Sequence, residues 1–325
     1  MTYPRLFYRY SRYLKEKYGE AVYRISVDAG FTCPHRDKHG VGGCSFCDEL
    51  GSRAAYQEDV VGESTVKIKR GSPVSQERLE IIRRQIEQGR EFLYGRYGAE
   101  RYILYLQAFS NTFAPISQLR HIYDFALSKA DFCEFIVSTR PDCVGQSHAQ
   151  FLAEYVQPDL DVWVELGLQT AHNATLRRVN RGHTVEQFEE AFNRLRSAGL
   201  KITVHLIFGL PGESQDEIMS SIDYVASLEP EAVKIHNLNV AAGTALSAEY
   251  MAGELVVPGG DRHLDYVIEA LQRLPADTVI QRITCDTSSA RLIAPLNFTP
   301  KGQFYQQLDR KMAQLGVYQG QRYQS

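Results

Sequence analysis

The sequence lacks several features that would narrow its function at once. It holds no run of about 18 apolar residues, so no segment is expected to cross a membrane. Its formal net charge is −3, which excludes binding to nucleic acid through overall positive charge. The first twenty residues lack the apolar core of a secretion signal, and we expect a cytoplasmic protein. No G-x-G-x-x-G follows the first expected strand and no P-loop is present, which argues against a nicotinamide enzyme.

Cysteine is also scarce, with six in 325 residues, yet Cys33, Cys44 and Cys47 fall within one stretch, FTCPHRDKHGVGGCSFC. Because disulfides are unlikely in the cytoplasm, clustered cysteines there more often bind metal or react. One interpretation is structural zinc, with His35 or His39 as the fourth ligand. Another is a [4Fe–4S] cluster held by three thiolates, with one iron left open to a small molecule. An unrelated thiol function is a third.

Strand-like and helix-like stretches alternate along the chain, which is typical of parallel strands joined by right-handed crossover helices. Two capping boxes, Thr184 with Gln187 and Ser214 with Glu217, predict helix starts. Six strand and helix units suit an incomplete barrel better than a closed one of eight. The expected strands lie at 21–30, 102–109, 134–142, 161–170, 201–213 and 231–240.

The predicted fold class is therefore α/β, a partial (β/α)6 TIM-type barrel with a short N-terminal helix and a C-terminal α/β extension. We divide the chain into a basic and aromatic helix over 1–19, the barrel over 20–245 and the extension over 246–325. A strand near Val279–Thr284 and a helix near Gly302–Leu315 are expected in the extension.

Polar residues and glycines follow the carboxyl ends of the expected strands, where barrel enzymes carry their active sites. The cysteine stretch follows the first strand, and Glu165 and Gln169 close the fourth. Structural zinc has no reason to lie at such a rim, so the location favours the cluster.

Several further segments carry a resemblance to a known family. The sequence resembles radical S-adenosylmethionine (radical SAM) enzymes, and within them the YhcC/YtqA (MnmL-type) family, which is related to the Elongator-type subgroup. The commonest spacing in the superfamily is C-x3-C-x2-C, with an aromatic residue before the last cysteine. Here Phe46 and the last pair match, whereas the first gap is longer, as in that subgroup. The matching segments are GFTCPHRD, GGCSFC, QAFSNTFAP, ELGLQTA, NRGHT, HLIFGLPGE, VKIHNLNV and GVYQG.

The resemblance implies two cofactors, a [4Fe–4S] cluster and S-adenosylmethionine (SAM), and an electron donor such as flavodoxin or ferredoxin. Cys33, Cys44 and Cys47 would be the cluster ligands. The usual Gly-Gly-Glu segment that meets the SAM amino group is absent, and 107–112 stands in its place. The other expected cofactor contacts follow from the resemblance and from polar side chains at the rim: Phe46, Gln107, Ser110, Asn111, Thr112, Ser138, Thr139, Arg140, Glu165, Gln169, Arg177, Arg181, Ile207 and Gly209.

Three residues are candidates for catalysis or for the substrate pocket. Glu165 lies in an apolar strand, where an unpaired carboxylate would be costly. His205 and His236 lie on expected strands and would face the interior of the barrel, although a core histidine with satisfied hydrogen bonds is the commoner case. Arg177 and Arg181 have the plain alternative of surface helix charges. The remaining thiols, Cys133, Cys143 and Cys285, are read as ordinary buried cysteines.

The resemblance further implies a transfer-RNA (tRNA) substrate, with removal of the carboxymethyl group from 5-carboxymethylaminomethyl-(2-thio)uridine at the wobble position. Basic residues would neutralise phosphates, and aromatic ones would stack on an unpaired base. The alternative is a helix that packs its aromatics on the barrel. The residues concerned are Arg5, Arg9, Arg12, Lys15 and Lys17 with Tyr3, Phe7, Tyr8, Tyr10, Tyr13 and Tyr18, a run at Lys67, Lys69 and Arg70, and Lys301, Arg310, Lys311 and Arg322 near the end.

Two other functions stay open from the residues. The same radical chemistry could act on a free base, a metabolite or a peptide. A zinc-stabilised RNA-binding protein without catalysis is the candidate from a different class. Retained tRNA would separate the first from the leading hypothesis, and broad absorption near 400 nm would reject the second.

Overall fold

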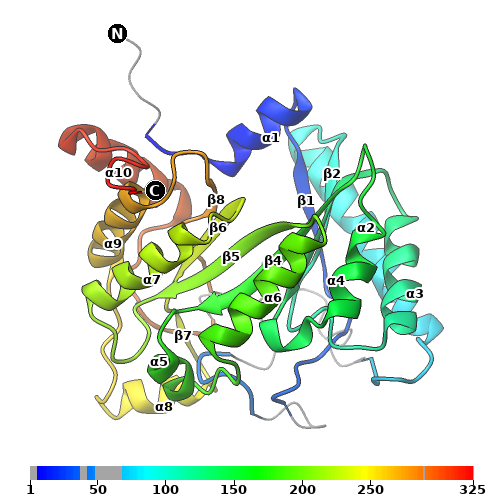
Figure 1. Cartoon of the computed structure of the whole chain (residues 1–325), viewed down its shortest axis with the longest axis horizontal. Helices are drawn as coiled ribbons and strands as arrows, with labels where there is room; N and C mark the ends of the chain where they lie inside the picture. The colour runs from blue at the N-terminus through cyan, green and yellow to red at the C-terminus, as the bar shows by residue number, and fades with distance from the viewer. Residues whose placement is uncertain (1–5, 37–41, 48–67, 288–289, 325) are drawn as a thin grey trace.

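The computed structural model describes residues 6–36, 42–47, 68–287 and 290–324. Its centre is a sheet of seven parallel strands in the order β1-β2-β3-β4-β5-β6-β8, curled into a half-barrel (Figure 1). The predicted fold class is confirmed. The strands are β1 (Tyr23–Val27), β2 (Tyr102–Leu106), β3 (Phe132–Thr139), β4 (Asp161–Gln169), β5 (Lys201–Phe208), β6 (Ala232–Asn237) and β8 (Val279–Arg282).

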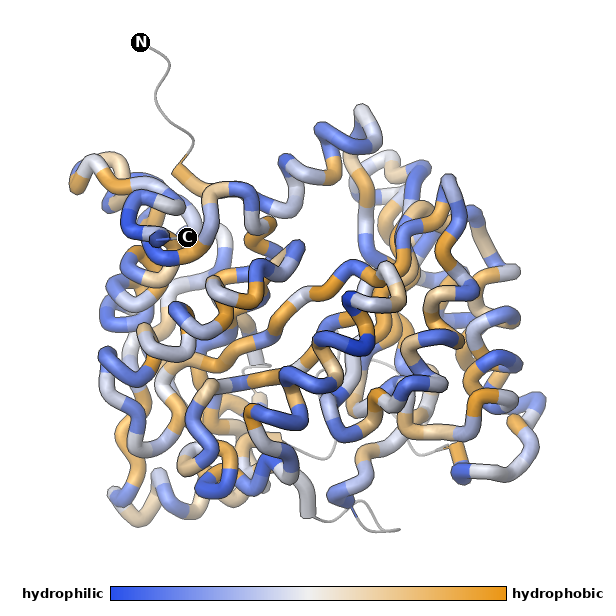
Figure 2. The backbone as a smooth tube through the Cα atoms, viewed as in Figure 1, coloured by the Kyte–Doolittle hydropathy of each residue, from blue (hydrophilic) through white to orange (hydrophobic). Residues whose placement is uncertain are grey.

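Helices cover the outer face of this sheet, and the main apolar core lies between them and the strands. Figure 2 shows apolar colour along the strands and alternating polar and apolar residues along the helices. The covering helices are α2 (Gln76–Tyr97), α3 (Ile116–Leu127), α4 (Gln146–Ala153), α6 (Val185–Ser197), α7 (Gln215–Ser227) and α9 (Gly260–Arg273). Shorter elements are a 3-10 turn (Pro141–Cys143), α5 (Asn173–Arg178), α8 (Ala245–Met251), and the antiparallel pair β7 (Val240–Ala241) and β9 (Leu292–Ala294).

Local signals place the two best-marked helices. Thr184 Oγ1 accepts a hydrogen bond from the backbone N–H of Gln187, Gln187 Oε1 accepts one from the backbone N–H of Thr184, and α6 begins there. Ser214 and Glu217 begin α7 in the same way. Both predicted capping boxes are confirmed, because the side chains satisfy backbone N–H groups that have no partner within the helix.

The strand expected near Val279 belongs to the main sheet, where β8 pairs in parallel with β6. The reason is α9, which the sequence reading did not identify. Its buried face, with Leu264, Val267 and Leu271, joins the main core together with Phe304 and Leu308 of α10 (Lys301–Leu315). The core thus continues past residue 245, and the proposed division at 19 and 245 stays a prediction.

Helix α1 (Tyr10–Tyr18) closes the half-barrel at the amino ends of the strands (Figure 1). Its Tyr10 and Leu14 pack in the interior against Trp163. Lys17 of this helix pairs with Asp161, and Arg9 at its N-cap pairs with Asp309.

Among the described residues of this segment, the packed-helix alternative therefore holds. The helix lies at the opposite end of the strands from the cysteine loop, which follows the last residue of β1. Tyr3, Arg5, His39 and Lys67 lie outside the described residues. No helix in the described part of the chain is long and apolar enough to cross a bilayer.

Candidate functional site

The cysteine loop leaves the carboxyl end of β1 and is tied to the opposite wall of the half-barrel. Ser45 N–H donates to Val179 O at 2.9 Å, and Asn180 Nδ2 donates to Gly43 O at 2.7 Å. Phe46 packs against the apolar cluster that contains Ile207 and Leu246. These contacts hold the loop over the carboxyl ends of the strands. Cys33 and Cys44 are buried there, and Cys47 is half-buried.

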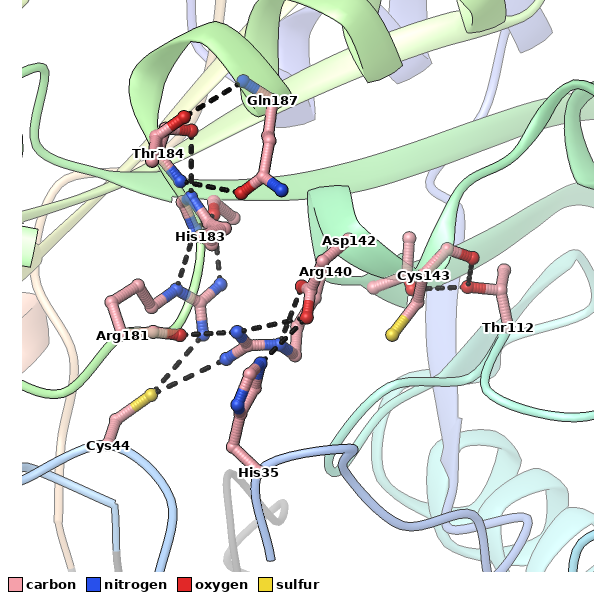
Figure 3. Close-up of polar contacts among 12 residues, drawn as sticks. His35, Cys44, Thr112, Arg140, Asp142, Cys143, Arg181, His183, Thr184 and Gln187 are labelled. Atoms are coloured by element: carbon pink, nitrogen blue, oxygen red, sulfur yellow. Dashed lines mark hydrogen bonds and ion pairs between the residues drawn. The ribbon is translucent and has the colours of Figure 1, made fainter.

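Three guanidinium groups surround the cysteine sulfurs. Arg36 Nη2 lies 3.2 Å from Cys47 Sγ, and the Nη1 atoms of Arg140 and Arg181 each lie 3.6 Å from Cys44 Sγ (Figure 3). Burial alone would lower the pKa of Arg140, but the neighbouring Cys44 and Cys33 sulfurs and Asp142 outweigh it, and that pKa is raised. The site is therefore arranged to stabilise negative charge on sulfur.

This environment fits a cluster bound by three thiolates. The guanidiniums offset the negative charge of the thiolates and donate hydrogen bonds to them, two effects that set cluster potentials. His35, one proposed fourth ligand for zinc, lies instead against Asp142, with Nε2 2.8 Å from Oδ2 (Figure 3). Among the residues that the structure describes, no three His, Cys, Asp or Glu side chains converge as a single-ion site.

The segment after β2 makes a tight turn at the rim. Ala108 and Phe109 both have positive φ, 71° and 58°, a strained conformation for residues with a Cβ. Asn111 stabilises it, since Nδ2 donates to Leu106 O, Ala108 O and Ser138 O. The Thr112 hydroxyl lies 2.5 Å from that of Thr139.

These side chains are therefore engaged with the protein. Ser110, Asn111, Thr112 and Thr139 are buried, whereas Gln107 is half-buried. The Oγ of Ser110 and the Oδ1 of Asn111 are buried without a partner among the described residues. As SAM contacts these residues stay predictions, and the structure gives most of them a role in holding the turn.

Glu165 is the centre of a hydrogen-bonded network inside the half-barrel. Its Oε2 accepts hydrogen bonds from Tyr105 at 2.5 Å, Ser138 at 2.8 Å and Lys234 at 2.7 Å. Arg24 Nη1 lies 3.8 Å from its Oε1. Burial would raise the pKa of Glu165, but Lys234 and Arg24 outweigh it and hold that pKa well below its ordinary range. Glu165 is thus a paired, ionised carboxylate, and its proposed part in catalysis or in cofactor binding stays a prediction.

His205 and His236 lie side by side on neighbouring strands, with ring centroids 4.1 Å apart. Burial, and then nearby positive charge, lowers the pKa of both; that of His205 falls to about 3. Both rings are therefore neutral at pH 7. His205 Nε2 is buried and has no hydrogen-bond partner among the described residues.

The remaining predicted contacts separate by exposure. Arg181 is buried and also donates from Nη2 to Gly167 O at 2.9 Å. Gln169 is buried with φ 76°, and Ile207 is buried. Gly209 has φ +86° and stands where a Cβ would lie 2.7 Å from Pro258 Cγ. Arg177 is exposed on α5, so the surface alternative describes it.

Sequence reasoning missed four interior residues, Arg24, Tyr105, Lys234 and Arg282. The alternation of a strand contains the signal for two of them. Tyr105 is two residues before Gln107, and Lys234 is two residues before His236, so each shares a face with a residue that was predicted to line the site. Arg24 and Arg282 were not singled out from the sequence.

A parallel half-barrel with a three-cysteine loop after its first strand defines the architecture of radical SAM enzymes. The profile of the radical SAM superfamily matches residues 31–225, and that of the radical SAM C-terminal domain matches 230–314. Protein YhcC of Escherichia coli is 33% identical over 94% of this chain and 91% of its own length. The chain belongs to the radical SAM superfamily and is a relative of YhcC, as predicted. Its cofactors are a [4Fe–4S] cluster and SAM.

Two more distant similarities were also found. A tRNA uridine(34) acetyltransferase of Methanocaldococcus jannaschii is 29% identical over 48% of this chain and 29% of its own length. The solved structure of Elp3 from Methanocaldococcus infernus superposes with a TM-score of 0.64 and 20% identity, covering 74% of this chain and 60% of that one. The second similarity concerns the fold alone.

Proposed function

We propose that this radical SAM enzyme modifies the wobble uridine of tRNA, converting the 5-carboxymethylaminomethyl group to the aminomethyl group. The observation that carries the radical chemistry is the buried three-cysteine loop with guanidiniums at its sulfurs, above an interior lined by polar side chains. The tRNA substrate is supported by the resemblance to the YhcC/YtqA family and by the sequence similarity to a tRNA uridine(34) acetyltransferase.

The chain's own residues divide the work as follows. Cys33, Cys44 and Cys47 would hold the cluster, and Arg181, whose Nη1 lies 3.6 Å from Cys44 Sγ, would pair with the SAM carboxylate. When bound, the cluster and SAM would supply one-electron reductive cleavage and hydrogen-atom abstraction from the substrate. A flavodoxin or ferredoxin would deliver that electron.

Glu165 holds neighbouring polar side chains of the interior in fixed positions. It fixes Lys234 and Tyr105 by short hydrogen bonds, so the polar groups beneath the cofactor are pre-arranged rather than mobile. His205 and His236 face the same interior as neutral imidazoles, each able to donate one hydrogen bond to a substrate. The inner face therefore holds several donors in fixed positions.

A second candidate is the same chemistry on a free base, a metabolite or a peptide. The packing of α1 favours this second candidate, because the aromatic residues of the described N-terminal segment pack against the barrel. Among the described residues, the basic side chains then left for RNA are those on the rim and near the C-terminus.

The test is a direct assay of the nucleoside. The protein is reconstituted anaerobically with iron and sulfide and mixed with SAM, a reductant and tRNA bearing the carboxymethylaminomethyl uridine. Digested nucleosides are read by mass spectrometry, with Cys44→Ala as the control. Conversion that is lost in the control supports the proposal. Formation of 5′-deoxyadenosine with an unchanged nucleoside would remove this substrate and direct the search to small molecules.

A further inference from the structure

A bulge in β8 brings an arginine into the interior of the half-barrel. Ile280 pairs with Val233 and Arg282 pairs with Lys234, so Gln281 is the extra residue between the two pairs. Bulges of this kind re-aim side chains and often lie next to active sites. Gln281 contacts Thr203, and the next residue, Arg282, also reaches an inward-facing side chain, His236. Two successive residues of β8, Gln281 and Arg282, thus contact side chains on the inner face.

Among the residues that the structure describes, Arg282 is an interior cation without an ion-pair partner. Lys234 pairs with Glu165 at 2.7 Å, and Arg24 lies 3.8 Å from the same carboxylate and donates to Gln281. Arg282 is half-buried, and among the described residues its one hydrogen bond is a long contact, 3.5 Å, to His236 Nε2. The His236 ring is neutral, so it does not compensate the charge of Arg282.

The interior carboxylate of Glu134 does not balance the charge of Arg282. Glu134 lies near the amino end of β3, where it accepts hydrogen bonds from Tyr10 and Tyr18. Burial and the positive charge of Arg282 lower the pKa of Lys301 of α10, and Asp286 opposes them. Asp286 is exposed and forms no ion pair with Arg282 among those found in the described part of the chain. A half-buried arginine near a second cation and without an ion-paired carboxylate is unfavourable unless a ligand brings negative charge.

His205 adds a second sign of a missing ligand. Its Nε2 is buried without a partner, and its ring packs against His236, which contacts Arg282. A planar anion would accept two hydrogen bonds from the guanidinium and one from an imidazole N–H. A carboxylate has this geometry.

We propose that Arg282, with His236 and His205, binds a carboxylate on the substrate. The inference rests on the proposed function, in which the substrate carries one carboxylate and the product carries none. Arg282 would then distinguish the two. Arg282 stands on β8, whereas the arginines that contact cysteine sulfur are Arg36 of the cysteine loop, Arg140 after β3 and Arg181 after α5. We therefore assign its carboxylate to the substrate rather than to SAM.

The test measures binding and turnover with anticodon stem-loops that differ at one group. The reconstituted holoenzyme is mixed with loops bearing carboxymethylaminomethyl uridine, the matching carboxamide, or aminomethyl uridine. Wild type should bind the carboxylate loop about tenfold to a hundredfold more tightly than the other two. Arg282→Gln should abolish that preference and raise KM, while Arg282→Lys retains part of it. Arg262→Gln, an exposed arginine of α9, should change nothing.

Other outcomes separate the possible errors. A preference that survives in Arg282→Gln overturns the inference, and so does weaker binding of all three loops alike, which would indicate a phosphate contact. Loss of SAM affinity in Arg282→Gln would assign this arginine to the cofactor. If wild type prefers the carboxylate loop through Arg282 and yet converts none of it, the carboxylate site stands and the proposed reaction fails.

Discussion

The carboxylate of Glu165 and the ammonium of Lys234 form an ion pair of 2.7 Å, and both side chains are at most 4% exposed. The pair links the fourth and sixth strands across the inner face. Such a buried pair stabilises the fold only while both partners are present, because either one alone is a buried charge with reduced compensation.

We therefore predict that Lys234→Met lowers the free energy of unfolding by about 3 kcal/mol or more. The double variant Glu165→Gln with Lys234→Met should lose less than the sum of the two single variants, because it leaves no orphaned charge. Urea unfolding of the three variants and wild type measures this. Simple additivity would show that the two side chains are not coupled.

Stability should fall as the pH falls below the ordinary pKa of histidine, partly through His263. This residue of α9 is buried, and its Nε2 lies 2.8 Å from Ile283 O. Burial lowers its pKa from 6.5 to about 4, so in this interval the unfolded chain binds a proton that the folded chain does not. Unfolding is then favoured as the pH drops.

His263→Gln should reduce the slope of unfolding free energy against pH by about 1.4 kcal/mol per pH unit in that interval. His205 and His236 keep the remaining slope positive, since their pKa values are also lowered. Urea titrations at several pH values measure it, and an unchanged slope would contradict a neutral buried His263.

Two glycines with positive φ provide a matched test of steric fit. A Cβ on Gly30, with φ +86°, would lie 2.4 Å from Nε of Arg78, a buried side chain that donates to Ala29 O. Gly199, with φ +76°, has nothing within 4 Å. Gly199→Ala should cost about 1–2 kcal/mol for the left-handed backbone alone. Gly30→Ala should cost clearly more, and equal losses in thermal or urea unfolding would contradict the contact.

The guanidinium of Arg181 should raise the reduction potential of the cluster, because a positive charge near a thiolate favours the added electron. Arg181→Gln should keep the cluster absorbance and move the potential to a more negative value. An interaction of about 1.4 kcal/mol corresponds to about 59 mV for one electron.

A redox titration followed by electron paramagnetic resonance measures the potential. Arg178→Gln is the control, because that arginine is exposed and pairs with Glu249. An equal shift in both variants would contradict a local effect of Arg181 on Cys44.

Much of the fold could be predicted because its signals are local. The capping boxes of α6 and α7 satisfy backbone groups three residues away, and their positions were correct. The membership of β8 in the main sheet could not be predicted from its own residues, since it depends on α9 and α10 packing against the same core. The same holds for α1, whose tyrosines are compatible both with stacking on RNA bases and with packing against the barrel.

The candidate site could likewise be predicted only in part. The cysteine loop and the family could be identified from residue types and spacing. Strand alternation could have placed Tyr105 and Lys234 on the inner face, but not their pairing with Glu165, because the polar residues of separate strands meet only when the sheet curls. Asn111 and Thr112 carried ligand-like side chains, but turn geometry engages them with neighbouring carbonyl and hydroxyl groups.

The most direct test of the account compares two products in one reaction. Holoenzyme, SAM and reductant are incubated with tRNA carrying the carboxymethylaminomethyl uridine or with the same tRNA unmodified, and 5′-deoxyadenosine and aminomethyl uridine are both quantified. We predict that 5′-deoxyadenosine rises in proportion to the aminomethyl nucleoside, falls to a background level with unmodified tRNA, and disappears in Cys44→Ala. Equal 5′-deoxyadenosine with both tRNAs and no new nucleoside would contradict the account.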